Sequence, residues 1–304
     1  MPDGVSFVVT VYNKARFLAP VLEAIAAQSG EFEREIIIVD DGSSDGSRAI
    51  AEEFAARNSD SRVIAQPNSG QTAATNLGCE AARMPFIKLV DADDLLLPNA
   101  TAALLAAIKN MGCGIAFGGF ASYDPAIIGL SGQAVPVPHP VRVLKDPLHA
   151  VLRRNLFIPS ACLIATALLR QLGGFDRRYR NIIDYDIAVR AAEVTSFAEV
   201  MHPVCLAPTA AENRMSGNVD LMYFETGEVL ADLVERRPDL PLALRRFALR
   251  RAASRAFRHA LRQGRHEHMA KLGAIRLLSL CPYVPAYPIL IRATGVAYRG
   301  RKDR

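Results

Sequence analysis

The sequence lacks several features that would place it in common functional classes. Its five cysteines are scattered, odd in number and never form a CxxC pair. This argues against a zinc site and a disulfide framework and indicates a reducing compartment. The histidines show no metal-ligand spacing, and neither GxGxxG nor GxxxxGK[ST] occurs, so there is no glycine-rich phosphate loop. If the chain binds a nucleotide, a metal ion and side chains must contact its phosphates.

Membrane-spanning and secretory signals are also missing. The N-terminus has no basic segment followed by an apolar core, so we expect no signal peptide. The apolar run 277–291 has 15 residues and three prolines, which is shorter than the ~20 apolar residues that a spanning helix needs. Half of the 304 residues are hydrophobic, which predicts a globular protein of one or two domains.

Charge is distributed unevenly along the chain. The net charge of +5 combines an excess of 14 positive charges in residues 236–304 with an excess of 9 negative charges in the rest. Such a split indicates two regions with different surroundings. We therefore predict a catalytic domain at residues 1–218 and a basic, mainly helical region at residues 219–304.

Short β-branched or apolar runs alternate with helical patterns through the first 120 residues. This alternation predicts an α/β fold with a mostly parallel sheet flanked by helices. The expected strands are 5–11, 35–39, 62–66, 86–90 and 114–120, and the expected helices lie near 17–26, 47–57, 72–83 and 99–110. Residues 122–147 are rich in proline and turns, and we interpret them as a long surface excursion.

Two of the expected strands end in acidic clusters. Asp40 and Asp41 follow the second strand, and Asp91, Asp93 and Asp94 follow the fourth. The carboxyl ends of parallel strands share one sheet edge, where open α/β folds bind ligands. Mg²⁺ is often held by one or two carboxylates together with substrate phosphates. We expect Asp91 and Asp93 to hold a metal–diphosphate group, although Asp residues also cap helices and form turns.

The pattern changes after residue 157. Residues 158–164 predict a strand, and residues 166–172 predict a short helix closed by Gly173 and Gly174. Asp184 falls in the first turn of a further predicted helix, where a carboxylate is favoured. It is a candidate either for a catalytic group or for a helix cap.

Residues 5–216 resemble the family 2 glycosyltransferases, which have the GT-A fold. The motifs that carry the resemblance keep their order and spacing: VVTVYNK (8–14), EIIIVDDGSSDGS (35–47), QPNSGQTAATN (66–76), VDADDLLLP (90–98), IPSACLI (158–164), GGFD (173–176) and IDYDIAVR (183–190). The resemblance implies an inverting glycosyltransferase. Such an enzyme uses Mn²⁺ or Mg²⁺ and moves a sugar from a nucleotide-sugar, most often a UDP-sugar, to a saccharide or lipid-linked acceptor.

The resemblance also assigns roles to individual residues. Thr10 and Tyr12 would line the base pocket, and Asp41, or its neighbour Asp40, would hydrogen-bond the base ring. Asp93 would bind the metal with Asp91 beside it, and Asp184 would be the catalytic base. The full set implied to bind the nucleotide-sugar is Thr10, Tyr12, Asn13, Asp40, Asp41, Asn76, Asp91, Ala92 and Asp93. Three positions depart from the family pattern, because Thr10 stands for the usual proline, Thr75 for a basic residue and Ile183 for an acid.

Two other functions remain open on the sequence. A nucleotidyltransferase also uses a sheet, a nucleotide and acidic metal ligands, but it usually carries a glycine-rich basic loop that residues 11–14 lack. A nonenzymatic nucleotide-binding or scaffold protein of the same fold is the second alternative. The intact Asp93 and Asp184 argue against it.

The basic region has a repeating pattern of its own. Five arginines recur at steps of three and four, which places them on one helix face opposite a stripe of Leu249 and alanines. Such a helix either contacts an anionic membrane surface or presents a solvated charged face. Without interleaved aromatic residues, nucleic acid is not expected as a partner. We expect a cytoplasmic enzyme, and if the basic helix contacts a membrane we expect that contact at the inner face of the plasma membrane. The arginines are Arg251, Arg255, Arg258, Arg262 and Arg265.

Overall fold

The computed structural model describes residues 3–124, 134–209, 218–281, 284 and 286–298. The chain forms two compact units. The first comprises residues 1–147, 155–180 and 191–212, and the second comprises residues 148–154, 181–190 and 213–304. The second unit thus takes two short segments from upstream of the predicted boundary at residue 218, and that boundary stays a prediction.

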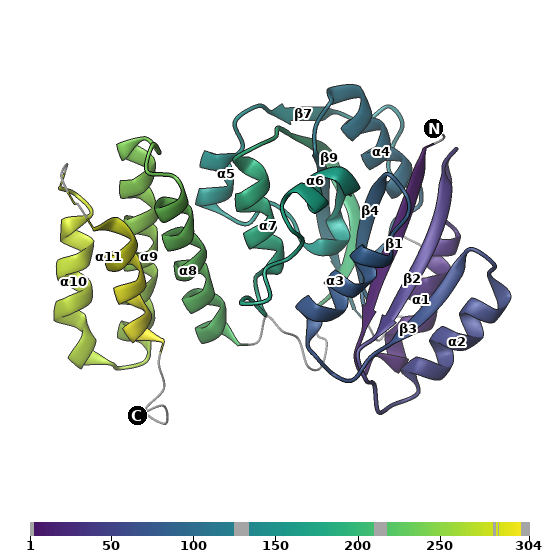
Figure 1. The fold of residues 1–304 in the computed structure, drawn as a ribbon, viewed down its shortest axis with the longest axis horizontal. Helices are drawn as coiled ribbons and strands as arrows, with labels where there is room; N and C mark the ends of the chain where they lie inside the picture. The colour runs from purple at the N-terminus through teal and green to yellow at the C-terminus, as the bar shows by residue number, and fades with distance from the viewer. Residues whose placement is uncertain (1–2, 125–133, 210–217, 282–283, 285, 299–304) are drawn as a thin grey trace. The chain divides into compact units, whose positions relative to one another are not determined.

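The first unit is built on one sheet with the strand order β3-β2-β1-β4-β8-β6-β9-β5, while β7 pairs with β9 (Figure 1). Strands β1 to β4 pair in parallel, as predicted, and so do β6 and β9, whereas β8, β5 and β7 join by antiparallel pairs. The strands are β1 (Gly4–Val11), β2 (Glu33–Asp40), β3 (Ser61–Ala65), β4 (Phe86–Asp91), β5 (Leu95–Leu96), β6 (Ile115–Tyr123), β7 (Val141–Leu144), β8 (Cys162–Ala165) and β9 (Phe197–Pro208).

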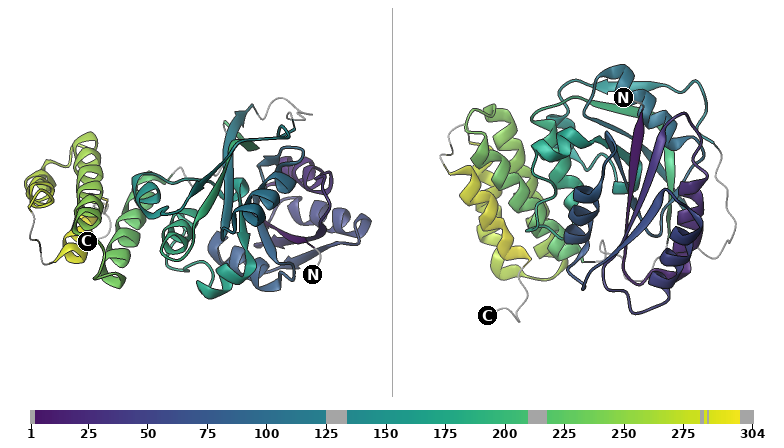
Figure 2. Two further views of the ribbon diagram at one scale, coloured as in Figure 1. Left: turned by 90° about the horizontal axis from the view of Figure 1, so that it is seen from above. Right: turned by 45° about the vertical axis from the view of Figure 1, so that its right-hand side comes forward.

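Helices connect these strands and flank the sheet, which confirms the predicted α/β fold (Figures 1 and 2). One close approach depends on a glycine: a Cβ atom on Gly78 would come 2.4 Å from Val8 Cγ1, so only glycine lets α3 lie this near the sheet. The helices along the sheet are α1 (Ala15–Ala26), α2 (Ser47–Arg57), α3 (Gln71–Ala81), α4 (Ala100–Met111) and α6 (Thr166–Gln171).

Two predicted segments differ from the structure. The expected surface excursion at 122–147 contains the strand β7, which pairs with β9, and its residues 125–133 lie outside the described part of the chain. The expected strand at 158–164 begins as a turn of 3₁₀ helix, Pro159–Ala161, before β8. Proline at the start of this turn fits the helical backbone, because the ring fixes φ near −65°.

The second unit is helical, as expected for the C-terminal region. Helices α8, α9 and α11 contact one another, and α10 packs on α9 (Figure 2). The predicted apolar stripe of α9 is its packing face, since Leu249, Ala253, Ala256 and Ala260 are fully buried. No helix among the described residues is long and apolar enough to span a membrane. The helices of this unit are α5 (Leu148–Arg153), most of α7 (Ile183–Ala192), α8 (Val219–Arg236), α9 (Leu242–Arg262), α10 (Met269–Leu278) and α11 (Tyr287–Ala293).

A buried carboxylate ties the amino-terminal half of the sheet together. Glu35 on β2 accepts hydrogen bonds from Ser6 Oγ (2.6 Å), Arg62 Nη1 (2.6 Å), Arg83 Nε (2.7 Å) and the Arg83 amide (2.9 Å). Burial alone would raise the pKa of Glu35, but these donors outweigh it and lower the pKa from 4.5 to about 2. The ionised carboxylate therefore stabilises the fold.

We predict that Glu35→Gln lowers the free energy of unfolding at pH 7 by about 2 kcal/mol, because it removes charge-assisted hydrogen bonds from a buried site. A group with a lowered folded-state pKa contributes stability above its unfolded pKa and loses it as pH falls. The gap between wild type and variant should therefore shrink between pH 4.5 and about 2. Urea unfolding across this range measures it. The exposed Glu53→Gln serves as the control, with an expected effect under ~0.5 kcal/mol. A gap that does not change with pH would contradict the prediction.

Candidate functional site

Strand pairing brings the ends of three strands to one edge of the sheet. In the parallel register, Thr10 on β1 lies opposite Asp91 on β4, and Val11 lies opposite Asp40 on β2. Thr10, Asp40 and Asp91 therefore lie on three neighbouring strands, within two residues of one another along the strand direction. The two acidic clusters share this edge, as the sequence predicted.

The loop after β1 is attached to the loop after β2. Asn13 has a left-handed backbone with φ of 53°, and its amide donates to Ser43 Oγ at 3.1 Å. Its side-chain oxygen accepts a hydrogen bond from the Ser44 amide at 2.8 Å. Asn13 thus holds the two loops together. The preceding Tyr12 leaves 48% of its surface exposed, so its ring is accessible to a ligand.

The carboxylate of Asp45 also holds these two loops together. Asp45 accepts hydrogen bonds from the Ser47 amide at 2.9 Å and the Ala15 amide at 3.1 Å. Burial opposes the charged form, but the hydrogen bonds from Ser47 and Ala15 outweigh it and hold the pKa of Asp45 below its ordinary value. The loops therefore form a fixed rim beside Tyr12.

Asp40 and Asp41 have different surroundings, although both are buried. Asp41 Oδ1 accepts from Gln66 Nε2 (2.6 Å) and the Ser69 amide (2.8 Å), and its Oδ2 accepts from the Gly70 amide (2.9 Å). These bonds engage both oxygens of Asp41 in holding the loop before α3. Within the described part of the chain, Asp40 Oδ1 accepts one long hydrogen bond, from the Ser43 amide at 3.3 Å. Of the two carboxylates, Asp40 keeps more capacity to accept a hydrogen bond from a ligand.

The second acidic cluster forms a tight turn at the end of β4. The Asp94 amide donates to the Asp91 carbonyl at 3.0 Å, so the chain reverses around the buried Ala92. The Asp91 amide donates to Ser160 Oγ at 2.9 Å, and Asp91 Oδ1 accepts from Gln71 Nε2 at 3.1 Å. Helix α4 begins only at Ala100 after a residue with φ of 62°, so these carboxylates do not cap it.

A fully buried lysine holds the segment that contacts this turn. Lys88 on β4 donates from Nζ to the carbonyl oxygens of Ser160 and Cys162, the latter at 3.1 Å. Burial lowers the pKa of Lys88, while nearby acidic groups including Asp91 partly offset the effect. Lys88 fixes the position of Ser160, whose hydroxyl oxygen in turn holds the Asp91 amide.

Asp93 forms an ion pair with Lys14. Its Oδ2 lies 2.7 Å from Lys14 Nζ, and the side chains of Asp93 and Lys14 are 13% and 17% exposed. Tyr123 donates its hydroxyl hydrogen to the Asp93 carbonyl at 3.0 Å. Burial, together with the charges of Asp93 and Asp94, raises the pKa of Tyr123 to about 12, so the hydroxyl keeps the hydrogen that it donates. Lys14 and Tyr123 thus fix the Asp93 segment.

Lys14, Gln71, Tyr123 and Ser160 were not among the predicted site residues. Lys14 ends the motif VVTVYNK, and its place directly after Tyr12 and Asn13 was the available signal. Gln71 and Ser160 lie within the motifs QPNSGQTAATN and IPSACLI, which were the available signals for them, whereas Tyr123 lies in none of the motifs.

The donor set at Asp91 and Asp93 fits a divalent cation that arrives with phosphates. Among the described residues, no three His, Cys, Asp or Glu side chains are grouped to hold a metal by themselves. Mg²⁺ commonly needs only one or two carboxylates, because water and substrate phosphates complete its coordination. A cation that binds Asp93 Oδ2 would take the place of the Lys14 ammonium group.

Two predicted residues belong to helices. Asn76 on α3 is buried and bonds with its amide group to both the amide and the carbonyl of Phe175, each at 2.8 Å. This pairing gives Asn76 a structural role, so we omit it from the proposed ligand site. Asp184 belongs to the second unit and lies in the first turn of α7. Its Oδ1 accepts from the Tyr185 amide at 2.8 Å.

Comparisons with known proteins agree on one family. Residues 6–133 match the family model described as glycosyl transferase family 2. The glycosyltransferase GlyG of Streptococcus pneumoniae is 34% identical over 125 residues, which cover 41% of each chain. The putative glycosyltransferase EpsH of Bacillus subtilis is 44% identical over 96 residues, which cover 32% of this chain and 28% of EpsH. Each match spans less than half of the relative.

Solved structures share the fold across nearly the whole chain. TarS 1–349 of S. aureus in complex with UDP-GlcNAc superposes with a TM-score of 0.59 at 16% identity, covering 99% of this chain and 92% of that one. The mannosyltransferase PcManGT from Pyrobaculum calidifontis, in complex with GDP-Man and Mn²⁺, has a TM-score of 0.53 at 19% identity and covers 98% and 88%. At these identities the likeness establishes the GT-A type of fold.

We predict that Lys14→Gln strengthens the binding of Mn²⁺, because it removes the cation that competes for Asp93. A partly exposed ion pair contributes about 1 kcal/mol, which corresponds to a roughly fivefold lower Kd. Titration calorimetry with Mn²⁺ alone measures the change. Lys109→Gln, which breaks the ion pair with Asp3, is the matched control and should leave the Kd unchanged. Weaker Mn²⁺ binding by Lys14→Gln would show that Lys14 does not compete with the metal.

Proposed function

We propose that this chain, whose residues 6–133 match glycosyl transferase family 2, transfers a sugar from a nucleoside-diphosphate sugar to an acceptor hydroxyl group. The observation that carries the proposal is the placement of the Asp91–Asp93 turn directly beside Thr10 in the sheet register. In this proposal Asp91 and Asp93 hold a metal–diphosphate group, and the exposed Tyr12, two residues after Thr10, contacts the nucleoside base.

The proposed donor site uses the residues at this sheet edge. Tyr12 and Thr10 line the base and ribose, and Asp40 accepts a hydrogen bond from the base. The backbone at Ala92 and the side chains of Asp91 and Asp93 face the diphosphate. UDP is the first candidate nucleotide. The comparison structures support both uridine and guanosine donors, since one contains UDP-GlcNAc and another GDP-Man.

Asp93 and Asp91 are the proposed ligands of Mn²⁺ or Mg²⁺. When bound, such a cation neutralises negative charge that develops on the departing diphosphate. Lys14, released from Asp93, carries a positive charge on a flexible stem beside the same group. It replaces in part the basic residue that is absent at Thr75.

Asp184 is the proposed catalytic base for inversion at the sugar carbon. It takes the proton of the acceptor hydroxyl as the oxygen attacks the sugar from the face opposite the diphosphate. Asp186, two residues further along α7, forms an ion pair with Arg190, whose Nη2 lies 2.6 Å from Asp186 Oδ2. The part-exposed Asp184 is thus better suited to meet an acceptor. Its place in the first helical turn favours a negative charge.

We further propose that the acceptor is a saccharide or lipid-linked sugar of the cell envelope. The basic second unit supports this proposal, because its excess of 14 positive charges in residues 236–304 suits peripheral contact with an anionic membrane surface. In this proposal the enzyme works on the cytoplasmic side of the membrane.

We predict that the protein slowly releases nucleoside diphosphate from UDP-sugars or GDP-sugars in the presence of Mn²⁺, and that Asp93→Asn reduces this release at least ~100-fold by weakening the metal–diphosphate contact. A coupled nucleoside-diphosphate assay measures the rate. The exposed Asp146→Asn controls for loss of one negative charge and should match wild type. Release of pyrophosphate from a nucleoside triphosphate and a sugar 1-phosphate, with no release of nucleoside diphosphate from the nucleotide-sugars, would identify a nucleotidyltransferase and contradict the proposal.

We also predict that Asp184→Asn slows sugar transfer to the acceptor by about 10²–10⁴-fold, the usual contribution of a positioned base. Donor binding should be unchanged, because Asp184 is not assigned to the donor site. Thermal-shift titration with UDP and Mn²⁺ measures donor binding separately from turnover. If Asp184→Asn retains transfer at the wild-type rate, Asp184 is a helix-turn residue and not the base.

A further inference from the structure

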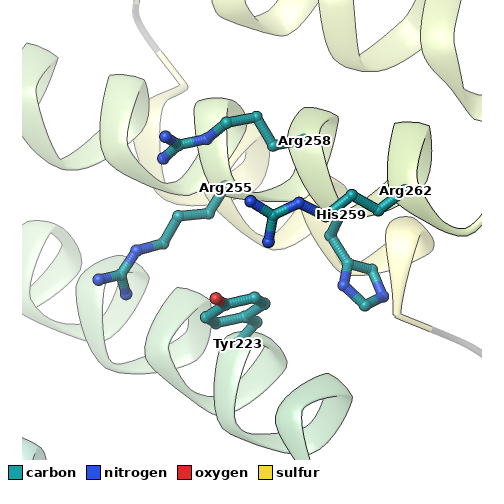
Figure 3. A pocket seen from close by; sticks show the side chains of 5 residues that line it. All are labelled: Tyr223, Arg255, Arg258, His259 and Arg262. Carbon is teal, nitrogen blue, oxygen red and sulfur yellow. The ribbon is translucent and has the colours of Figure 1, made fainter.

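Three arginines of the second unit surround one hollow between α8 and α9. Arg255, Arg258 and Arg262 lie at steps of three and four on α9, so they share one face. Together with His259 and Tyr223 they line a cavity of about 230 Å³. Figure 3 shows the side chains of Arg255 and Arg262 extending from α9 toward the ring of Tyr223 on α8. All five residues belong to the second unit.

The five arginines of the predicted stripe have different surroundings in the structure. At one end, the guanidinium carbon of Arg251 lies 5.4 Å from the ring centre of Tyr185, and part of its head group is buried. At the other end, Arg265 lies 3.6 Å from Asp220 and donates a hydrogen bond to the Ala297 carbonyl. Only the middle three arginines face the cavity, so the charge is gathered at one place.

The three cavity arginines lack carboxylate partners in the described part of the chain. The head group of Arg258 forms one hydrogen bond, to the Ser254 carbonyl at 3.2 Å. Arg292 in the same unit shows the opposite arrangement, because it lies within ion-pair distance of Glu228, Asp232 and Glu235. The bundle thus neutralises an arginine that joins its helices and leaves the cavity arginines available to an anion.

Asp220, which lies beside the cavity residue His259, does not neutralise the three arginines. Asp220 Oδ1 lies 2.9 Å from His259 Nε2, and its Oδ2 contacts Arg265. The first contact is not a hydrogen bond, and the buried Nε2 atom has no hydrogen-bond partner among the residues that the structure describes. Burial lowers the pKa of His259, against the opposing effect of Asp220. Asp220 is therefore engaged beside His259 and does not pair with the three arginines.

Aromatic packing holds part of the cavity in place. The guanidinium carbon of Arg255 lies 5.6 Å from the ring centre of Tyr223, and His259 packs edge-on to the same ring at 5.9 Å. A guanidinium on an aromatic face keeps its N–H groups free at its edge. Arginine forks of this kind bind phosphate oxygens in pairs.

We propose that this cavity binds a phosphate group, as a monoester or diester, through Arg255, Arg258 and Arg262 with the Tyr223 hydroxyl as a further donor. The cavity is smaller than the ~300–1,000 Å³ of pockets for drug-sized ligands, which suits a phosphate-bearing head group and not a whole nucleotide-sugar. Such a group comes either from an anionic lipid or from a soluble phosphate ester. The site goes beyond the proposed transferase function, since it takes no part in donor binding.

Two probes distinguish these sources. Glycerol 3-phosphate is titrated by ³¹P NMR, and vesicles of phosphatidylglycerol in phosphatidylcholine are tested by flotation, in each case with the full chain. Arg255→Gln and Arg262→Gln each remove one cavity charge. Arg250→Gln removes one exposed charge from the same helix outside the cavity and serves as the matched control. Circular dichroism melting checks that each variant is folded.

The expected result is binding of at least one probe, weakened about tenfold or more by Arg255→Gln and by Arg262→Gln and less than twofold by Arg250→Gln. Binding of glycerol 3-phosphate assigns a soluble ester, and binding of vesicles alone assigns a lipid head group. Binding of neither probe overturns the proposal. Equal loss in all three variants also overturns it, because the attraction would then be diffuse charge. The assays contain no nucleotide-sugar, so failure here leaves the proposed transferase function untouched.

Discussion

Parallel pairing in one register is the constraint on which the rest of the site depends. Because Thr10 lies opposite Asp91 and Val11 opposite Asp40, three chain reversals occur at one edge of the sheet. The loops that follow cannot separate, since Asn13 bonds to Ser43 and Ser44. Asp93 then reaches Lys14 across strands. The charges of the site are therefore positioned by backbone hydrogen bonds of the core, and a ligand meets them already in place.

Much of the fold was predictable because strong local patterns specify it. The runs VSFVVTV, EIIIV and FIKLV are β-branched or apolar and are fully or largely buried, and the helical patterns between them match α1 to α4 within a few residues. The strand β7 was not predicted, because its four residues are partly or fully exposed and follow a proline-rich segment. Its pairing with β9 is a long-range contact that local periodicity does not encode.

The candidate site was predictable in its acidic residues but not in their partners. Sequence position placed Asp40, Asp41, Asp91 and Asp93 at strand ends, and it left open which carboxylate serves the fold. The hydrogen bonds of Asp41 to the loop before α3 answer that question. The Lys14–Asp93 pair joins residues 79 positions apart, and no pattern of hydrophobicity or turn residues specifies such a contact. In the second unit, likewise, α9 was recognised while the cavity beside Tyr223 needed the packing of α8.

The central claim is that the Asp91–Asp93 turn receives a cation together with the diphosphate of a nucleotide. Anomalous scattering from Mn²⁺ in crystals grown with UDP or GDP tests it most directly. The account predicts a manganese peak within coordination distance of an Asp93 carboxylate oxygen and of the nucleotide phosphates, with Lys14 turned away from Asp93. A manganese–nucleotide complex bound elsewhere on the chain, with the Lys14–Asp93 ion pair intact, would contradict it.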